Sequence, residues 1–149
     1  MKRIIITVAT TGALAFPAAA MAYWPQPTVT KQLGNKCSVT AAGIVRVLTE
    51  PNHFSLTYGG GTSCAGGTGN KSLVAELQIQ VNTGTHVMWY PIRTVQRFNY
   101  RGNPLRLVSS DDIADACECS HDYRISATAT DTDNGVTKMG TALSAVLRA

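Results

Sequence analysis

The sequence has little net charge, and its charged residues are dispersed along the chain. Charged residues make up 15% of the 149 residues, and the formal net charge is +4. Lys2 and Arg3 lie in an N-terminal segment that we predict to be cleaved. Without them the chain has eleven basic and nine acidic residues, a net charge of +2. So small an excess gives no electrostatic basis for binding nucleic acid or an anionic membrane surface. We therefore expect no nucleic-acid partner.

Motifs of hydrolytic enzymes are also missing. The sequence has no Gly-x-Ser-x-Gly elbow, and His53, His86 and His121 have no evident serine or thiol partner. A glycosidase would need two carboxylates facing a cleft, which the sequence does not predict. We expect no cofactor, and the sequence favours a non-catalytic protein.

Long apolar runs are confined to the N-terminus. Lys2 and Arg3 precede an uncharged, mostly apolar run, and an Ala-x-Ala pattern ends at Ala22. This order is typical of a Sec-type signal peptide, whereas the run is shorter than the ~20 residues that a membrane anchor requires. We predict that 1–22 is a cleaved signal peptide, that 23–149 is one secreted or cell-envelope domain, and that this mature chain has no transmembrane segment.

Four cysteines follow the predicted cleavage point. They are Cys37, Cys64, Cys117 and Cys119. An even number in an exported chain indicates two disulfides, and the spacing alone allows three pairings. A bridge between Cys117 and Cys119 would close a very tight, strained ring. We therefore favour pairing of each of these two with Cys37 or Cys64.

The most regular predicted elements are strands. Apolar and polar residues alternate over 123–130, and Asn134-Gly135 then suits the two positive φ angles of a type I′ hairpin turn. Leu73–Val81 alternates most cleanly and predicts a central strand. The segment 86–98 predicts a long strand that is broken or bulged at Pro91.

Other segments are less regular. Cys37–Leu48 and His53–Tyr58 flank a Pro-Asn turn and predict a second hairpin. The glycine-dense Gly59–Asn70 predicts a loop rather than a strand. The Leu-Arg-Leu at 105–107 predicts a short strand. Ser109–Ala116 is the only helix-like stretch, with a serine cap and acidic residues in its first turn.

About seven strands, with turn signals roughly every ten residues, indicate a β-sandwich or barrel. Three features resemble an immunoglobulin or fibronectin type III domain. They are Trp89 for the strand C tryptophan, Asp111–Asp115 for the E-to-F connection, and Asp122-Tyr123 for the tyrosine corner. The resemblance covers 73–147. It implies an all-β, antiparallel immunoglobulin-like β-sandwich of about seven strands with one short helical turn.

The chain departs from this family in its cysteines. Two residues after the corner tyrosine, where an immunoglobulin domain carries its inter-sheet cysteine, this chain has Ile125. With Leu73–Val81 as strand B, Cys64 and Cys37 would come to the same end of the sandwich as the 109–121 loop. We therefore hypothesise that two disulfides fasten the N-terminal hairpin and the glycine loop to that loop.

An arginine-rich and aromatic segment is the predicted binding surface. Arg93 and Arg97 share a strand face by parity, and arginine with aromatic residues is typical of protein interfaces and of sugar stacking. The alternative is an edge strand whose arginines prevent sheet-to-sheet aggregation, with the aromatic residues half in the core. A protein or carbohydrate ligand is expected. The candidate residues are Tyr90, Arg93, Arg97, Phe98, Tyr100 and Arg101.

Alternatives to a non-catalytic binding or envelope-associated module involve other parts of the chain. Cys117, Cys119 and His121 lie at i, i+2 and i+4, so a strand would place all three on one side as a copper or zinc site. Oxidation on export and the single nearby histidine argue against this site, and we expect no bound metal. The remaining alternatives are an enzyme or metal-binding protein that uses the Asp111–His121 loop, and a structural subunit that self-associates through an edge strand.

Overall fold

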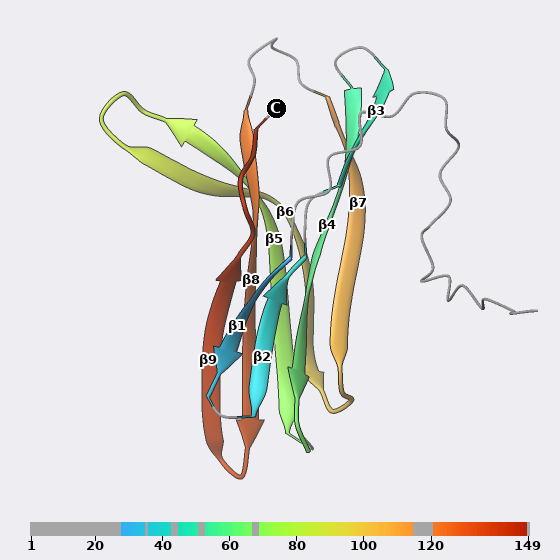
Figure 1. Cartoon of the computed structure of the whole chain (residues 1–149), viewed down its shortest axis with the longest axis vertical. Helices are drawn as coiled ribbons and strands as arrows, with labels where there is room; N and C mark the ends of the chain where they lie inside the picture. Colours follow the sequence, from blue (N-terminus) through green and yellow to red (C-terminus); the bar gives the residue numbers. More distant parts are fainter. Residues whose placement is uncertain are drawn as a thin grey trace, which may run out of the picture.

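The described part of the chain folds into two antiparallel β-sheets in a sandwich-like arrangement (Figure 1). The computed structural model describes residues 28–34, 36–42, 45–50, 53–66, 69–114 and 121–148. All ten elements in these ranges are strands, which confirms the expected all-β class with two antiparallel sheets. None of these residues forms a helix with the length and hydropathy that a bilayer crossing needs. The predicted signal peptide lies outside the described residues.

The first sheet is organised around one long strand. Its members are β1 (Val29–Leu33), β2 (Cys37–Ala41), β3 (Val45–Glu50), β4 (His53–Cys64) and β7 (Leu105–Ala114). β4 pairs with β2 and β3 along one edge and with β7 along the other. β1 extends the sheet beyond β2, so β7 is the edge strand on the opposite side.

The second sheet is built on two long central strands. Its members are β5 (Asn70–Asn82), β6 (Val87–Tyr100), β8 (Asp122–Asp133), β9 (Val136–Leu143) and β10 (Leu147–Arg148). β5 lies between β6 and β8, so the prediction of a central strand at 73–81 is confirmed. β9 and β10 pair with the far edge of β8, which leaves β6 as the other edge strand.

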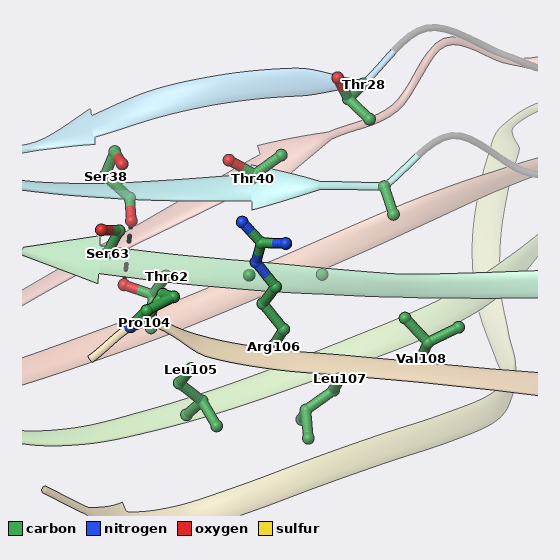
Figure 2. Close-up of a pocket in the computed structure, with 13 residues that line it drawn as sticks. Thr28, Ser38, Thr40, Thr62, Ser63, Pro104, Leu105, Arg106, Leu107 and Val108 are labelled. Carbon is green, nitrogen blue, oxygen red and sulfur yellow. Dashed lines mark hydrogen bonds between the residues drawn. The ribbon is translucent and has the colours of Figure 1, made fainter. Parts of the chain in front are cut away.

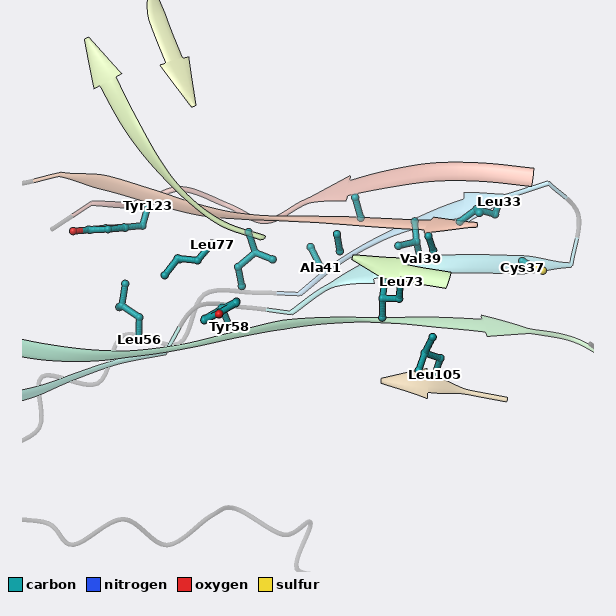
Figure 3. Packing of buried hydrophobic residues seen from close by; sticks show 14 of the residues in the cluster. Leu33, Cys37, Val39, Ala41, Leu56, Tyr58, Leu73, Leu77, Leu105 and Tyr123 are labelled. Atoms are coloured by element: carbon teal, nitrogen blue, oxygen red, sulfur yellow. The ribbon is translucent and has the colours of Figure 1, made fainter. Parts of the chain in front are cut away.

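The core lies between the sheets and follows the alternation seen in the sequence. Leu73, Ala75 and Leu77 of β5 are fully buried, whereas the residues between them are partly exposed. Figure 3 shows both leucines in the layer between the sheets. Burying each leucine contributes about 1.5–3 kcal/mol relative to leaving it exposed. Other large members of the buried cluster are Leu33, Val39, Leu56, Leu105, Tyr123 and Ile125.

The predicted turn and bulge of the second sheet are both present. Asn134 and Gly135 have φ angles of 50° and 75° and connect β8 to β9, as a type I′ turn requires. In β6, the register with β5 shifts beside Pro91, so that Ile92 is the extra residue of a β-bulge. Both predictions are confirmed. Both could be made from the sequence because each rests on a backbone requirement that few residues satisfy.

Two other local predictions are wrong. The expected helix at Ser109–Ala116 is absent over 109–114, because these residues continue β7 and pair with 53–58 of β4. Pairing with a neighbouring strand has overridden the local helix signals. The expected loop at Gly59–Asn70 is wrong over 59–64, which form the second half of β4.

Close approach of neighbouring strands and of the opposite sheet explains two of the glycines in β4, Gly59 and Gly60. A Cβ atom at Gly60 would lie 2.8 Å from the Ala127 Cβ of the opposite sheet, and one at Gly59 would meet the Leu107 carbonyl oxygen. Here glycine lets backbones pack closely, so a run that resembles a flexible loop in the sequence is a strand in the fold.

The predicted disulfide pairing is also wrong. Cys37 of β2 lies directly opposite Cys64 of β4, with 4.0 Å between their Cα atoms, and the two form a disulfide. Neighbouring strands of one sheet hold the pair together, so neither cysteine bridges to the 109–121 segment. Cys117 and Cys119 lie outside the described residues. Asn103 supports the bridge, because its side chain accepts from the Cys64 amide at 2.9 Å and donates to the Cys64 carbonyl at 2.7 Å.

The strand correspondence drawn from the immunoglobulin resemblance needs a correction. It assigned Leu73–Val81 to strand B and Trp89 to strand C, which lie in opposite sheets of that fold. Here the two segments pair with each other as β5 and β6 of one sheet. Tyr123 is buried at the start of β8, the position that the resemblance implied for the corner tyrosine.

Candidate functional site

The predicted binding residues follow β6, the edge strand of the second sheet. Arg93 lies opposite Leu77 and Arg97 opposite Leu73, so the two arginines share one side of the strand, as parity predicted. Both leucines point into the core. Because β6 is an edge strand, however, both arginines lie at the open side of the sandwich formed by this edge, where they remain exposed.

Two register shifts bring tyrosines to this same side. Simple alternation would place Tyr90 and Tyr100 on the face opposite the arginines. The bulge at Ile92 reverses the parity, so Tyr90 pairs with Ile79 on the core-facing side of β5. A second shift, near Asn99 with its φ of 55°, places Tyr100 opposite the buried Lys71. Sequence alternation alone could not predict this grouping.

Arg93 is tied to the first sheet. Its Nε lies 3.7 Å from Asp111 Oδ1 on β7, and Tyr58 of β4 donates a hydrogen bond of 2.8 Å to Asp111 Oδ2. Burial, reinforced by this bond to the carboxylate, raises the pKa of Tyr58 above its ordinary value. These three side chains therefore join the sheets across the open side, and Arg93 has a structural role there.

Arg97 and Arg101 are more available. Arg97 lies over the ring of Tyr100, with its guanidinium carbon 5.6 Å from the ring centroid, while Tyr100 packs against the core. Arg101 follows the last residue of β6 and is exposed. Neither arginine has a carboxylate partner within the ranges that the structure describes. Each can therefore pair with an acidic group on a ligand.

The β5–β6 hairpin projects sideways from the sandwich, in yellow-green in Figure 1. It bends away where the bulge at Ile92 interrupts the ladder, as bulged strands do. On one face Val81 lies opposite Met88, next to Tyr90, and these side chains are 38%, 45% and 43% exposed. The Tyr90 hydroxyl contacts Met88 Sδ at 3.3 Å. The hairpin therefore presents an apolar face to solvent.

The opposite face of the hairpin is held by its neighbour β8. The Arg124 guanidinium lies over the Trp89 ring, 4.2 Å from its centroid, and Arg124 Nε donates to Gln78 Oε1 at 2.9 Å. Partial burial lowers the pKa of Arg124. Trp89 is thus half-buried against an arginine and is not part of the buried cluster between the sheets. The contacts of Arg124 with Trp89 and Gln78 therefore hold the hairpin against β8.

Together these side chains form what we call the β6 surface. It combines an apolar hairpin face with cations, and the sequence of β6, VMWYPIRTVQRFNY, contains no acidic residue. Methionine, tyrosine and arginine are the residue types that protein interfaces favour. The β6 surface consists of Met88, Tyr90, Arg93, Arg97, Tyr100 and Arg101.

The alternative site at 111–121 is described only at its ends. Asp111 is engaged by Tyr58 and Arg93, as described above, and His121 is half-buried just before β8. Cys117 and Cys119 lie outside the described residues. The less favoured alternative of a metal site at these two cysteines and His121, and the expectation of no bound metal there, therefore both stay hypotheses.

A buried ion pair lies beside the disulfide. Lys71 Nζ is 3.8 Å from Asp131 Oδ1, and the two side chains are 0% and 8% exposed. Lys71 also donates to the Gly69 carbonyl at 3.2 Å, and Asp131 Oδ2 lies 3.3 Å from Cys37 Sγ. Cys37, Cys64 and Asp131 are close enough to share a metal ion, but the disulfide already uses both sulfurs. We assign this cluster a structural role.

A groove of about 330 Å³ lies on the outer face of the first sheet (Figure 2). Ser38 and Thr40 of β2 line one side, Arg106 and Val108 of β7 line the other, and Gly61 of β4 lies between them. The sequence did not predict this groove. The sequence features that form the groove are the alternating small hydroxyl residues of β2 and a glycine in the neighbouring strand β4. This combination can be recognised only once it is known that these strands pair.

The chain matches no known family model and no curated protein. Function must therefore be argued from the site itself.

Proposed function

We propose that this protein is an exported immunoglobulin-like module that binds another protein through the β6 surface. The strand order supports the fold assignment. β4 pairs with β7 as strands B and E do, and β9, β8 and β5 follow one another as G, F and C do, with β6 beside β5 as an added strand. The disulfide between Cys37 and Cys64 and the predicted signal peptide support export.

One observation carries the binding proposal. Two departures from regular alternation in a single edge strand bring Tyr90 and Tyr100 to the side that carries Arg93 and Arg97. Bulges disrupt the ladder locally, and in natural proteins they often serve to redirect side chains. A strand that served only to protect the sheet edge would need its charges but not this grouping of aromatic residues.

The charge of the β6 surface indicates an acidic partner. Arg97 and Arg101 have no carboxylate partner in the part of the chain that the structure describes, and β6 has no acidic side chain. A second copy of β6 would bring more arginines and no carboxylate to this surface, so it would not supply the opposite charge. We therefore infer a partner segment that combines carboxylates with an apolar or aromatic anchor.

Selection from a displayed library of random peptides tests this proposal. The oxidised protein should enrich sequences that contain acidic residues next to an aromatic or large aliphatic one. The double variant Tyr90→Ser with Arg97→Gln should bind the selected peptides at least about tenfold more weakly, because it loses an apolar anchor and a charge-assisted hydrogen bond. The matched control is Lys138→Gln with Met139→Ser on β9, where both residues are exposed.

The control should retain wild-type affinity. Failure to enrich any sequence class, or equal binding by the β6 double variant and the wild type, would contradict the proposal. Enrichment of β6-like sequences of this same chain would instead indicate a self-associating subunit.

A further inference from the structure

The groove on the outer face of the first sheet contains a glycine that packing does not explain. Gly59 and Gly60 have no room for a side chain, as described above. A Cβ at Gly61, in contrast, would lie 3.5 Å from the Leu105 carbonyl oxygen and 3.7 Å from Arg106 Cγ, which are ordinary van der Waals distances. Glycine inside a strand weakens it by roughly 0.5–1 kcal/mol relative to alanine. What glycine provides at position 61 is the hollow on the outer face.

The cation beside this hollow has no ion-pair partner in the described part of the chain. Arg106 extends from β7 across β4 toward Thr40 in Figure 2. No acidic side chain lines the groove, and Arg106 has no ion-pair partner among the residues described. A guanidinium presents a planar fork of donors that matches a carboxylate with two parallel hydrogen bonds.

The rest of the groove suits a polyhydroxylated molecule. Ser38, Thr40 and Ser63 contribute hydroxyl groups, which can donate or accept, and Thr40 is oriented by its hydrogen bond of 2.9 Å with Thr30. Pro104 and Val108 add apolar surface on the β7 side, where Val108 is 69% exposed. Hydroxyl groups on one wall and apolar surface beside the arginine on the other match the polar and apolar faces of an acidic sugar ring.

We propose that this groove binds an acidic sugar, with its carboxylate on Arg106 and its ring over Gly61. The sugar hydroxyls would bond to the serine and threonine hydroxyls of β2 and β4. The groove and the β6 surface lie on different faces, since the groove residues point outward from the first sheet and the β6 surface lies at the edge of the second. The inference therefore does not depend on the proposed protein partner.

Binding of simple probes to the oxidised protein tests this inference. Sodium glucuronate, sodium acetate and glucose are titrated at constant ionic strength, and amide chemical shifts are followed by NMR. We expect saturable shifts in β2, β4 and β7 with glucuronate, at an affinity at least about tenfold above that of acetate or glucose, because only glucuronate uses the arginine and the hydroxyl wall together.

Three variants locate the site. Arg106→Gln and Gly61→Val should each weaken glucuronate binding by about tenfold or more, the first by removing the charge-assisted bonds and the second by filling the hollow. Lys138→Gln, which removes an exposed cation of β9 outside the groove and outside the β6 surface, should bind as the wild type does. Unchanged urea unfolding of the Gly61→Val protein would show that its loss of binding is not a loss of folding.

The possible outcomes separate clearly. The inference is overturned by a lack of saturable binding, by unchanged binding in Arg106→Gln, or by an equal effect of Lys138→Gln. Acetate binding as tightly as glucuronate would overturn the sugar assignment, and glucose binding as tightly would overturn the role of the carboxylate.

Discussion

Arg93 on β6 and Asp111 on β7 form an ion pair of 3.7 Å that joins the edge strands of the two sheets. Tyr58 approaches the same carboxylate from β4 and donates a hydrogen bond of 2.8 Å to it. The Asp111 carboxylate therefore contacts the β6 surface through Oδ1 and the buried Tyr58 through Oδ2. This arrangement separates Arg93, which connects the sheets, from Arg97 and Arg101, which remain available to a partner.

Alkaline pH should destabilise the protein partly through Tyr58. Burial, together with the hydrogen bond to Asp111, raises the pKa of Tyr58, so the folded state holds the phenolic proton more tightly than the unfolded state does. That contribution is fully present below the unfolded pKa of about 10 and is lost as the pH rises through the raised pKa. Free energies of unfolding measured by urea from pH 7 to 11 should fall less steeply in Tyr58→Phe. Identical pH profiles for the two proteins would contradict this.

Peptide mapping should find the bridge within the first sheet. Trypsin cleavage without reduction is expected to leave peptides 37–46 and 47–71 joined, and 107–124 separate from both, because Cys37 and Cys64 pair across β2 and β4. The double variant Cys37→Ala with Cys64→Ala should lose about 3 kcal/mol of unfolding free energy, as expected for a loop with a sequence separation of 27. Recovery of 107–124 covalently joined to 37–46 or 47–71 would show that this pairing is incorrect.

Neighbouring glycines of β4 should respond differently to substitution. A methyl group at Gly60 would lie 2.8 Å from the Ala127 Cβ and 3.0 Å from the Thr40 carbonyl oxygen, so Gly60→Ala should lose about 1–3 kcal/mol by overpacking. Gly61→Ala, with room for its methyl group, should be neutral or slightly stabilising. Urea unfolding of both variants measures this. Equal losses would refute the distinction between a packed and an open position.

The buried pair of Lys71 and Asp131 should be strongly coupled. Lys71→Met leaves a carboxylate that is nearly inaccessible to water, which should cost about 3–5 kcal/mol. Adding Asp131→Leu removes that unpaired charge, so the double variant should be more stable than Lys71→Met alone. A double-mutant cycle on urea unfolding gives the coupling energy. Additive losses would mean that the two charges do not stabilise each other.

Local structure was predictable from the sequence where a backbone requirement leaves few choices of residue. Asn134-Gly135 satisfies two positive φ angles, Leu73–Val81 alternates without interruption, and Pro91 cannot complete a ladder, so a turn, a central strand and a bulge were predictable. The same local rules failed where neighbouring strands decide the outcome. Residues 109–114 resemble a helix start and 59–64 resemble a loop, yet both become strands because β4 and β7 pair with each other.

The shared strand side of the two candidate arginines was predictable, but the grouping of the other side chains around them was not. Parity placed Arg93 and Arg97 on one side, and the register confirms it. The addition of Tyr90 and Tyr100 to that side depends on two register shifts, whose effect on side-chain direction requires the partner strand. The disulfide failed for a similar reason, since its pairing follows from the register of β2 with β4.

Substitutions on the two faces of β6 test the central claim most directly. Peptides selected on the wild-type protein are titrated against Tyr90→Ser and Arg97→Gln, which lie on the predicted binding side, and against Thr94→Ala and Gln96→Ala, which lie opposite Glu76 and Val74 on the other side. We predict that the first two variants each weaken binding by about tenfold, whereas the latter two bind like the wild type. Equal losses on both faces, or losses at Thr94 and Gln96 alone, would contradict the assignment of the β6 surface.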